Sequence, residues 1–128
     1  MAQVKVYGRR DVWAGRQLEV SDLLHSCVQQ AWQLPAEKRF HRFLLLDADD
    51  LICPQRGSGY LIIEIVCFTG RSDEAKRDLI RSVYALLPTA LDLSPDDIEI
   101  TIIESPKVNW GIRGVPAEEL TLSYKVEV

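Results

Sequence analysis

The chain has 128 residues, of which 47% are hydrophobic and 27% are charged, and its formal net charge is -4 at pH 7. This length and composition predict one globular domain over residues 1–128. The acidic balance argues against a nucleic-acid partner, which would require a basic surface. The longest apolar run, at residues 60–68, contains Glu64 and is too short to cross a bilayer, so we expect no membrane partner.

The first half of the chain predicts two strands and a helix. Residues 3–7 alternate polar and apolar side chains, which is the pattern of a half-buried strand. Apolar residues recur at helical spacing over residues 20–31, and Ser21 or Asp22 is the expected cap of this helix. Residues 40–46 contain three consecutive leucines and predict a strand that is buried on both faces.

The second half repeats this order of elements. Residues 61–68 are nearly all apolar and predict a third strand. Ser72 is followed by two acidic residues, which predicts the capped start of a helix. Pro88 is the expected end of that helix. Residues 98–103 place three isoleucines on one face of a fourth strand.

The two halves therefore predict a tandem βαβ repeat. Side by side, two such units form a mixed four-stranded sheet with two helices on one face, which is an α/β (α+β) architecture. The strands are too apolar to leave the opposite face of the sheet in water. We therefore expect that face to be covered by further copies of the chain.

The last residues of the chain carry one more strand pattern. Residues 120–128 alternate strictly between apolar and polar side chains, which predicts an extra C-terminal strand. A free strand edge favours pairing with another chain. We therefore expect this strand to pack at a subunit boundary.

The cysteines do not indicate a disulfide framework. Cys27, Cys53 and Cys67 are odd in number, and none of them belongs to a C-x-x-C pair. Cys27 and Cys67 fall within apolar patterns, which is typical of buried thiols in a reducing compartment. Because the sequence also lacks a signal-peptide pattern, we expect a cytoplasmic protein.

The two histidines are the remaining titratable candidates. We expect His25 to lie in solvent on the polar side of the first helix, and His41 to be structural at the start of a strand. Two histidines without carboxylates at ligand spacing do not form a metal centre. The sequence has no glycine-rich phosphate loop, so we expect neither a metal nor a cofactor.

Four short motifs follow one another along the chain: LPAEKRF before the second strand, TGRSDEAK after the third, LSPDDI before the fourth and VNWGIRG after it. With the early strand and the doubled βαβ unit, their order resembles the tautomerase superfamily, and within it the malonate semialdehyde decarboxylase-like group. The resemblance covers nearly the whole chain. It implies the tautomerase/MIF-like fold, a homotrimer and a cofactor-independent enzyme. The catalytic group of that family is an N-terminal proline exposed by removal of the initiator methionine.

The resemblance implies substrate-binding roles for two residues. Arg71 stands where the family places an arginine that holds a small carboxylate ligand, and its planar guanidinium matches a carboxylate in shape and charge. Trp110 matches an aromatic residue that lines the pocket. The residues alone leave two alternatives open, in which Arg71 is an exposed first-turn residue and Trp110 fills a gap in the core.

Other positions depart from the family pattern. Ala2 stands in place of the proline, so a catalytic primary amine is available there only if Met1 is removed. Lys38 stands where the decarboxylases carry an aspartate, and Thr69 stands where a second substrate-binding arginine is expected. Ile112 replaces an aromatic residue in the last of the four motifs.

Two functions therefore remain open. In the first, the protein is an enzyme with an altered active site and weak isomerase or decarboxylase-type chemistry on a small carboxylated keto or enol substrate. In the second, it is a non-catalytic pseudo-enzyme whose trimer binds a ligand or serves as a scaffold.

Overall fold

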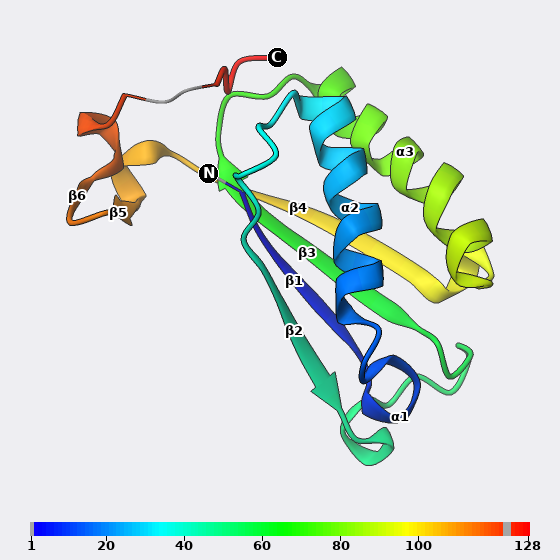
Figure 1. Ribbon diagram of the computed structural model, residues 1–128. Coiled ribbons are helices and arrows are strands. Elements are labelled where there is room, and N and C mark those ends of the chain that lie inside the picture. The colour runs from blue at the N-terminus through cyan, green and yellow to red at the C-terminus, as the bar shows by residue number, and fades with distance from the viewer. Residues whose placement is uncertain (1, 122–123) are drawn as a thin grey trace.

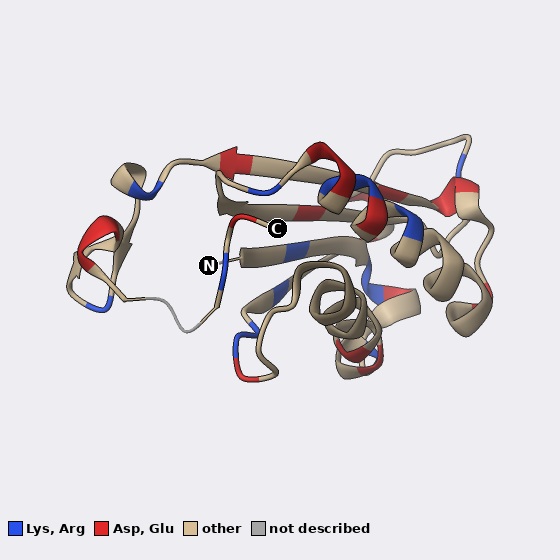
Figure 2. Ribbon diagram, turned by 90° about the horizontal axis from the view of Figure 1, so that it is seen from above, with Lys and Arg blue, Asp and Glu red and all other residues tan. Residues whose placement is uncertain are grey.

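The computed structural model describes residues 2–121 and 124–128 (Figure 1). Its main sheet has four strands in the order β2-β1-β3-β4. Their bounds are β1 (Ala2–Arg9), β2 (His41–Leu46), β3 (Leu61–Phe68) and β4 (Ile98–Ser105). The long helices α2 (Gln17–Trp32) and α3 (Asp73–Leu91) cover one face of the sheet, as Figures 1 and 2 show from two directions. The expected sheet and its two-helix layer are confirmed.

Several short elements complete the fold. They are the helix α1 (Arg10–Trp13), the hairpin strands β5 (Gly111–Ile112) and β6 (Val115–Pro116), and four 3-10 turns at Ala48–Asp50, Pro95–Asp97, Lys107–Asn109 and Ala117–Glu119. The hairpin extends from the end of β4 and stands away from the sheet (Figure 1). Charges of both signs alternate along α3 (Figure 2).

Strand direction determines which ends of the sheet meet. β1 is parallel to β2 and antiparallel to β3, and β3 is parallel to β4. The register pairs Val4 with His41, Ala2 with Cys67, and Cys67 with Glu104. The starts of β1 and β2 therefore lie at the same end of the sheet as the ends of β3 and β4.

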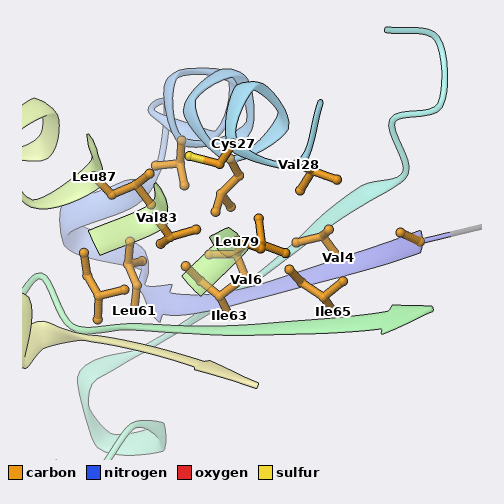
Figure 3. Close-up of a cluster of buried hydrophobic side chains, with 14 of the residues drawn as sticks. Val4, Val6, Cys27, Val28, Leu61, Ile63, Ile65, Leu79, Val83 and Leu87 are labelled. Carbon is orange, nitrogen blue, oxygen red and sulfur yellow. The ribbon is translucent and has the colours of Figure 1, made fainter. Parts of the chain in front are cut away.

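The core lies between the sheet and the two helices. In β1 and β3 every second side chain is buried, as expected for strands with one face against helices. Figure 3 shows the inward side chains of these strands pointing at those of the helices, and the labelled core residues are Val4, Val6, Cys27, Val28, Leu61, Ile63, Ile65, Leu79, Val83 and Leu87. Each fully buried aliphatic side chain of this kind stabilises the fold by roughly 1.5–3 kcal/mol.

The edge strand β2 differs from its prediction. We expected burial on both faces, but in the single chain its residues alternate between half-buried and exposed up to Leu44, which is 37% exposed. His41 and Phe43 lie in register with inward-facing residues of β1, so Arg42 and Leu44 face the uncovered side. A run of leucines does not distinguish a strand buried by its own chain from one that awaits a partner.

The predicted start of the first helix is wrong. α2 begins at Gln17 after Arg16, whose side chain makes no capping hydrogen bond. Ser21 and Asp22 lie inside the helix instead, where Ser21 Oγ bonds to His41 Nδ1 at 2.7 Å. The Ser21 hydroxyl therefore forms a tertiary hydrogen bond to β2 instead of capping the helix.

The second helix starts where the sequence predicts, but it ends later. The side chain of Ser72 accepts a hydrogen bond from the backbone N–H of Ala75 at 3.1 Å. The helix passes through Pro88 and ends at Leu91. Pro88 and Leu91 are both buried in the core, so packing offsets the single backbone hydrogen bond that a proline removes.

The C-terminal tail does not form the expected strand. Its described residues, 120–121 and 124–128, carry no strand assignment, and residues 122–123 of the predicted strand lie outside the described residues. Val126 is buried against Phe68 and Ala117 of its own chain. The backbone N–H of Ser72 donates to the carbonyl oxygen of Val128 at 3.1 Å. The tail thus crosses the start of α3, and Val126 packs within its own chain. Its place at a subunit boundary stays a prediction.

Candidate functional site

The chain topology brings the predicted site residues to one end of the sheet. Ala2 starts β1 and pairs with Cys67 near the end of β3. Thr69 and Arg71 follow directly after β3, and Trp110 follows β4. Both the start of β1 and the C-terminal tail lie at this end in Figures 1 and 2.

Arg71 is buried, which excludes the alternative of an exposed first-turn residue. Only 5% of the residue is exposed, and the guanidinium carbon lies 4.2 Å from the centre of the Trp32 ring. Nη1 donates to the carbonyl oxygen of Phe68 at 3.4 Å. Nε and Nη2 have no hydrogen-bond partner among the described residues. Burial lowers the pKa of Arg71 from its ordinary value, and arginine side chains stay protonated in proteins.

Trp32 is a rigid platform for this cation. The residue is fully buried at the end of α2, and its Nε1 donates to the carbonyl oxygen of Ala75 at 3.0 Å. A desolvated cation over a tryptophan face gains about 2 kcal/mol. This stacking orients the Arg71 guanidinium, whose Nε and Nη2 have no hydrogen-bond partner among the described residues.

Cys67 lies near Arg71 and pairs with Ala2 of β1. Both residues are buried. Burial raises the pKa of the Cys67 thiol, while the nearby Arg71 acts in the opposite direction. The thiol is therefore neutral at pH 7, and Arg71 is the cationic side chain among these three residues.

Trp110 lies after β4, at the same end of the sheet. Its ring packs edge-on against Phe68, with centroids 5.1 Å apart and an interplanar angle of 78°. Its Nε1 donates to the carbonyl oxygen of Ser105 at 3.2 Å, and its own carbonyl oxygen accepts from the N–H of Ala117. The side chain is only partly buried. Trp110 therefore packs on the second core cluster and still presents aromatic surface at this end.

Thr69 and Lys38 contribute less to this geometry. Thr69 is exposed, and its backbone N–H donates to the carbonyl oxygen of Ser105 at 3.1 Å, which joins the ends of β3 and β4. Lys38 is partly buried in the connection before β2, and its backbone N–H donates to Pro35 at 3.0 Å. Both residues lie at the same end of the sheet as Arg71, but the hydrogen bonds described for them involve only the backbone.

The sequence reasoning missed Tyr124. This half-buried tyrosine packs against both core clusters. Burial raises its pKa, while the positive charges of Arg71 and Arg113 act in the opposite direction. The alternating pattern of residues 120–128 put Tyr124 on the apolar face of a predicted strand. That prediction gave no reason to expect Tyr124 near Arg71.

A second buried polar cluster lies between α2 and β2, and it overturns one prediction. His25 is 1% exposed rather than solvated, and its Nε2 bonds to the carbonyl oxygen of Ala36 at 2.9 Å. Its ring packs edge-on against that of His41, 5.7 Å away. Burial, with smaller effects from His25 and Arg39, lowers the pKa of His41 to about 4. His41 is therefore neutral near pH 7, in agreement with a structural role.

Two absences hold for the part of the chain that the structure describes. It contains no helix that is both long and apolar enough to cross a membrane. Within the same residues, no group of three or more His, Cys, Asp or Glu side chains gathers in a way that could hold a metal ion.

Comparison with known proteins identifies the family of the chain. Residues 38–113 match the family model described as Tautomerase enzyme. The chain is 39% identical over 59 residues to 2-hydroxymuconate tautomerase of Pseudomonas putida, which covers 46% of this chain and 94% of that relative. The enzyme of the same name from Comamonas testosteroni is 39% identical over 57 residues, covering 44% of this chain and 90% of that relative. The chain belongs to the tautomerase family.

Solved structures show the same fold over almost the whole chain. A native fused 4-OT superposes with a TM-score of 0.82 at 21% identity, covering 92% of this chain and 98% of that one. Malonate semialdehyde decarboxylase superposes with a TM-score of 0.80 at 18% identity, covering 91% and 94%. The expected family and the expected tautomerase fold are confirmed.

Proposed function

We propose that the protein is an isomerase of altered active site that binds a small carboxylated keto or enol substrate at Arg71 and interconverts its tautomers slowly. One observation carries this proposal. Arg71 is a buried cation with two nitrogens that lack a hydrogen-bond partner among the described residues, and it lies at the sheet end where β1 starts. A buried, unsatisfied guanidinium is costly unless an anion completes its hydrogen bonds.

The chemistry needs only a carboxylate anchor and a group that moves a proton. In an enol acid, the hydroxyl oxygen loses a proton, the double bond shifts, and a carbon atom gains a proton, so substrate and product contain the same atoms. Arg71 binds the carboxylate through its fork of N–H groups. If Met1 is removed, the amine of Ala2 is a candidate for the proton transfer, because an α-amino group has an ordinary pKa of about 7.7–8.0.

Three positions predict slow turnover. Ala2 replaces the family proline, Lys38 replaces an aspartate, and Thr69 replaces a second arginine. Each lost catalytic or charge-stabilising group typically removes about 10²–10³ in rate. We therefore expect turnover at least about 10³-fold below that of a family member that has all of these groups.

Turnover of 2-hydroxymuconate tests the proposal, because the relatives that the chain resembles are named 2-hydroxymuconate tautomerase. We expect slow loss of the enol absorbance with the wild-type protein, and faster loss with Ala2→Pro when intact mass shows that Met1 is absent. Arg16→Gln is the matched control, since it changes an arginine remote from Ala2. Wild-type turnover as fast as that of the Pseudomonas putida enzyme, or no gain with processed Ala2→Pro, would contradict the proposed role of Ala2.

The burial of Arg71 under the C-terminal tail favours the second function. A cation that is 5% exposed can bind and retain a carboxylate without any group placed to move a proton. The protein is then a non-catalytic ligand-binding or scaffold member of the family. Carboxylate binding that depends on Arg71, with no turnover in wild-type or processed Ala2→Pro protein, identifies this case.

We also propose a homotrimer. The sheet face opposite the helices carries the exposed side chains of Leu44 and Ile103, which are 37% and 40% exposed, beside the Lys5–Glu64 ion pair at 3.8 Å. Two fused 4-OT structures with TM-scores of 0.80 and 0.76 are described as trimers. Sedimentation should give a trimer, and Ile103→Glu should shift it toward monomer. A stable wild-type monomer at micromolar concentration would contradict this assembly.

We propose a cytoplasmic location as well. The three cysteines are free thiols in the structure, and reducing compartments maintain that state.

A further inference from the structure

A serine and a histidine form a hydrogen-bonded pair between α2 and β2. Ser21 Oγ lies 2.7 Å from Nδ1 of His41. The guanidinium of Arg39 approaches the same hydroxyl oxygen, with its Nη1 at 3.5 Å, and also donates to the carboxylate of Asp22. Since Oγ accepts this bond from Arg39, the hydroxyl proton of Ser21 is available to His41. A hydroxyl within hydrogen-bond reach of a base is the arrangement that makes serine a nucleophile.

The pair lies at the wall of an open cavity of about 330 Å³. Ser21, Arg39 and His41 all line this cavity, and so do the apolar side chains of Leu18 and Phe43. Its volume is near the lower end of the range of about 300–1,000 Å³ that is typical of ligand sites. Because Ser21 is only 6% exposed, a group that reacts with its hydroxyl must be small enough to fit this cavity.

His25 supports the ring of His41. Its own Nε2 donates to the carbonyl oxygen of Ala36 at 2.9 Å, since a carbonyl oxygen can only accept. The two rings pack edge-on, with centroids 5.7 Å apart. The His41 ring is thus held by a neighbouring ring and by the bond from Nδ1 to Ser21. A base held in this way keeps its acceptor nitrogen aimed at the nucleophile, as acyl transfer requires.

From this geometry we infer that Ser21 is a nucleophile that accepts the acyl group of a small ester, with His41 as its base and Arg39 as the cation that stabilises the oxyanion. This esterase activity is separate from the proposed tautomerase activity. Ser21 Oγ bonds to the carbonyl carbon, and its proton passes to Nδ1 of His41. The bond from that carbon to the leaving oxygen or sulfur then breaks, and the leaving group takes the proton. Water cleaves the acyl-serine ester, which releases the acid and restores the hydroxyl.

The basicity of His41 limits the class of ester. Burial lowers its pKa to about 4, so at neutral pH the imidazole is free to accept a proton but is a weak base. The proton transfer therefore assists the reaction only modestly, and the ester must already have a good leaving group. We expect aryl esters and thioesters of small acids to react, and alkyl esters to remain intact.

Hydrolysis of p-nitrophenyl acetate by the full-length wild-type chain tests this inference. We expect release of nitrophenol, with an acetyl group on Ser21 when acid stops the reaction early. Fragmentation of the tryptic peptide 17–38 by mass spectrometry locates that group. Ser21→Ala should lower the release to the rate without protein. His41→Gln should slow it about 100-fold, because glutamine can bond to Ser21 but is not a base.

Ser26→Ala is the matched control. Ser26 lies on the same helix and in the same tryptic peptide, but its hydroxyl donates to the carbonyl oxygen of Leu23 at 2.7 Å. This variant should release nitrophenol at the wild-type rate. Ethyl acetate, which carries the same acyl group on a poor leaving group, should not be hydrolysed by the wild type.

The outcomes are distinct. A wild-type chain without an acetyl group on Ser21 overturns the inference, and this result does not depend on the folding of any variant. Equal release by Ser21→Ala and the wild type also overturns it, because the reacting group then lies elsewhere. If His41→Gln loses activity while Ser21→Ala keeps it, the histidine itself is the nucleophile and the role of Ser21 is wrong.

Discussion

Two arginines at the starts of the two long helices provide the most informative comparison in the molecule. Arg16 lies 4.7 Å from the Trp13 ring, and Arg71 lies 4.2 Å from the Trp32 ring. Arg16 also bonds to Glu19 at 3.0 Å, and its side chain is 39% exposed. Arg71 is 5% exposed and pairs with no carboxylate among the described residues.

The difference shows that stacking on a tryptophan does not by itself indicate a binding site. At Arg16 the charge is neutralised by a neighbour in the first helical turn and by water, so the arrangement is complete. At Arg71 the same stacking orients a buried charge that has no salt bridge to a carboxylate among the described residues, and its Nε and Nη2 lack hydrogen-bond partners there. The distinguishing feature is a buried cation without a carboxylate partner.

The largest effect that this comparison predicts is on ligand affinity. Arg71→Gln should weaken adipate binding about 100-fold, because it removes charge-assisted hydrogen bonds to a carboxylate in a desolvated site. Arg16→Gln should change the affinity by less than about twofold. Calorimetry on both variants measures this contrast. An equal loss of adipate affinity in the two variants would show that Arg71 is no more important for binding than Arg16.

A smaller effect concerns the pH dependence of stability at the contact between α2 and the edge strand β2. α2 contacts β2 through His41, whose pKa is about 4 when folded and ordinarily about 6.5. Between these values the unfolded chain binds more protons, so the free energy of unfolding should fall as the pH drops from about 6.5 to about 4. With allowance for solvent at this half-buried ring, the loss is about 2 kcal/mol.

His41→Gln isolates this effect, because glutamine can still bond to Ser21 and does not titrate. Urea unfolding at pH 7, 5.5 and 4.5 should show the wild type losing stability relative to the variant as the pH falls. If the free energies of unfolding of the two proteins change equally with pH, protonation of His41 does not destabilise the folded protein.

The smallest effect is on the stability of the protein without ligand. Arg71→Met should raise the free energy of unfolding by about 1 kcal/mol, because it removes an uncompensated buried charge while keeping contact with the Trp32 ring. Arg16→Met should lower it only slightly, because an exposed ion pair contributes little to stability. Thermal melting with paired urea curves measures both, and a destabilised Arg71→Met would show that the guanidinium is satisfied within the fold.

Local chemistry made parts of the fold predictable from sequence. The third strand was predicted at residues 61–68, where β3 lies, because apolar periodicity is a property of the segment itself. The cap at Ser72 was predictable for the same reason, since its hydrogen bond reaches only to Ala75. Arg71 and Ala2 could be placed at one end of the sheet because the family resemblance fixed the order of the strands.

Features that depend on distant segments were not predictable in this way. The burial of Arg71 requires the tail, more than fifty residues later, to cross the start of α3 instead of forming a strand. The burial of His25 follows from packing against distant segments, because its ring bonds to Ala36 and packs edge-on against His41 of β2. A helical wheel drawn from the sequence assigned that position to solvent.

The central place of β1 in the sheet has a consequence for the timing of folding during synthesis. β1 pairs on one side with β2 and on the other with β3, so that Val4 lies opposite both His41 and Ile65. At roughly 5–20 residues per second, a ribosome needs about 3–12 s to make the 60 or so residues that separate β1 from its β3 partner. During that interval one edge of β1 stays open to strands of neighbouring nascent chains. Translation speed and prompt chaperone contact should therefore influence how many copies acquire the native sheet.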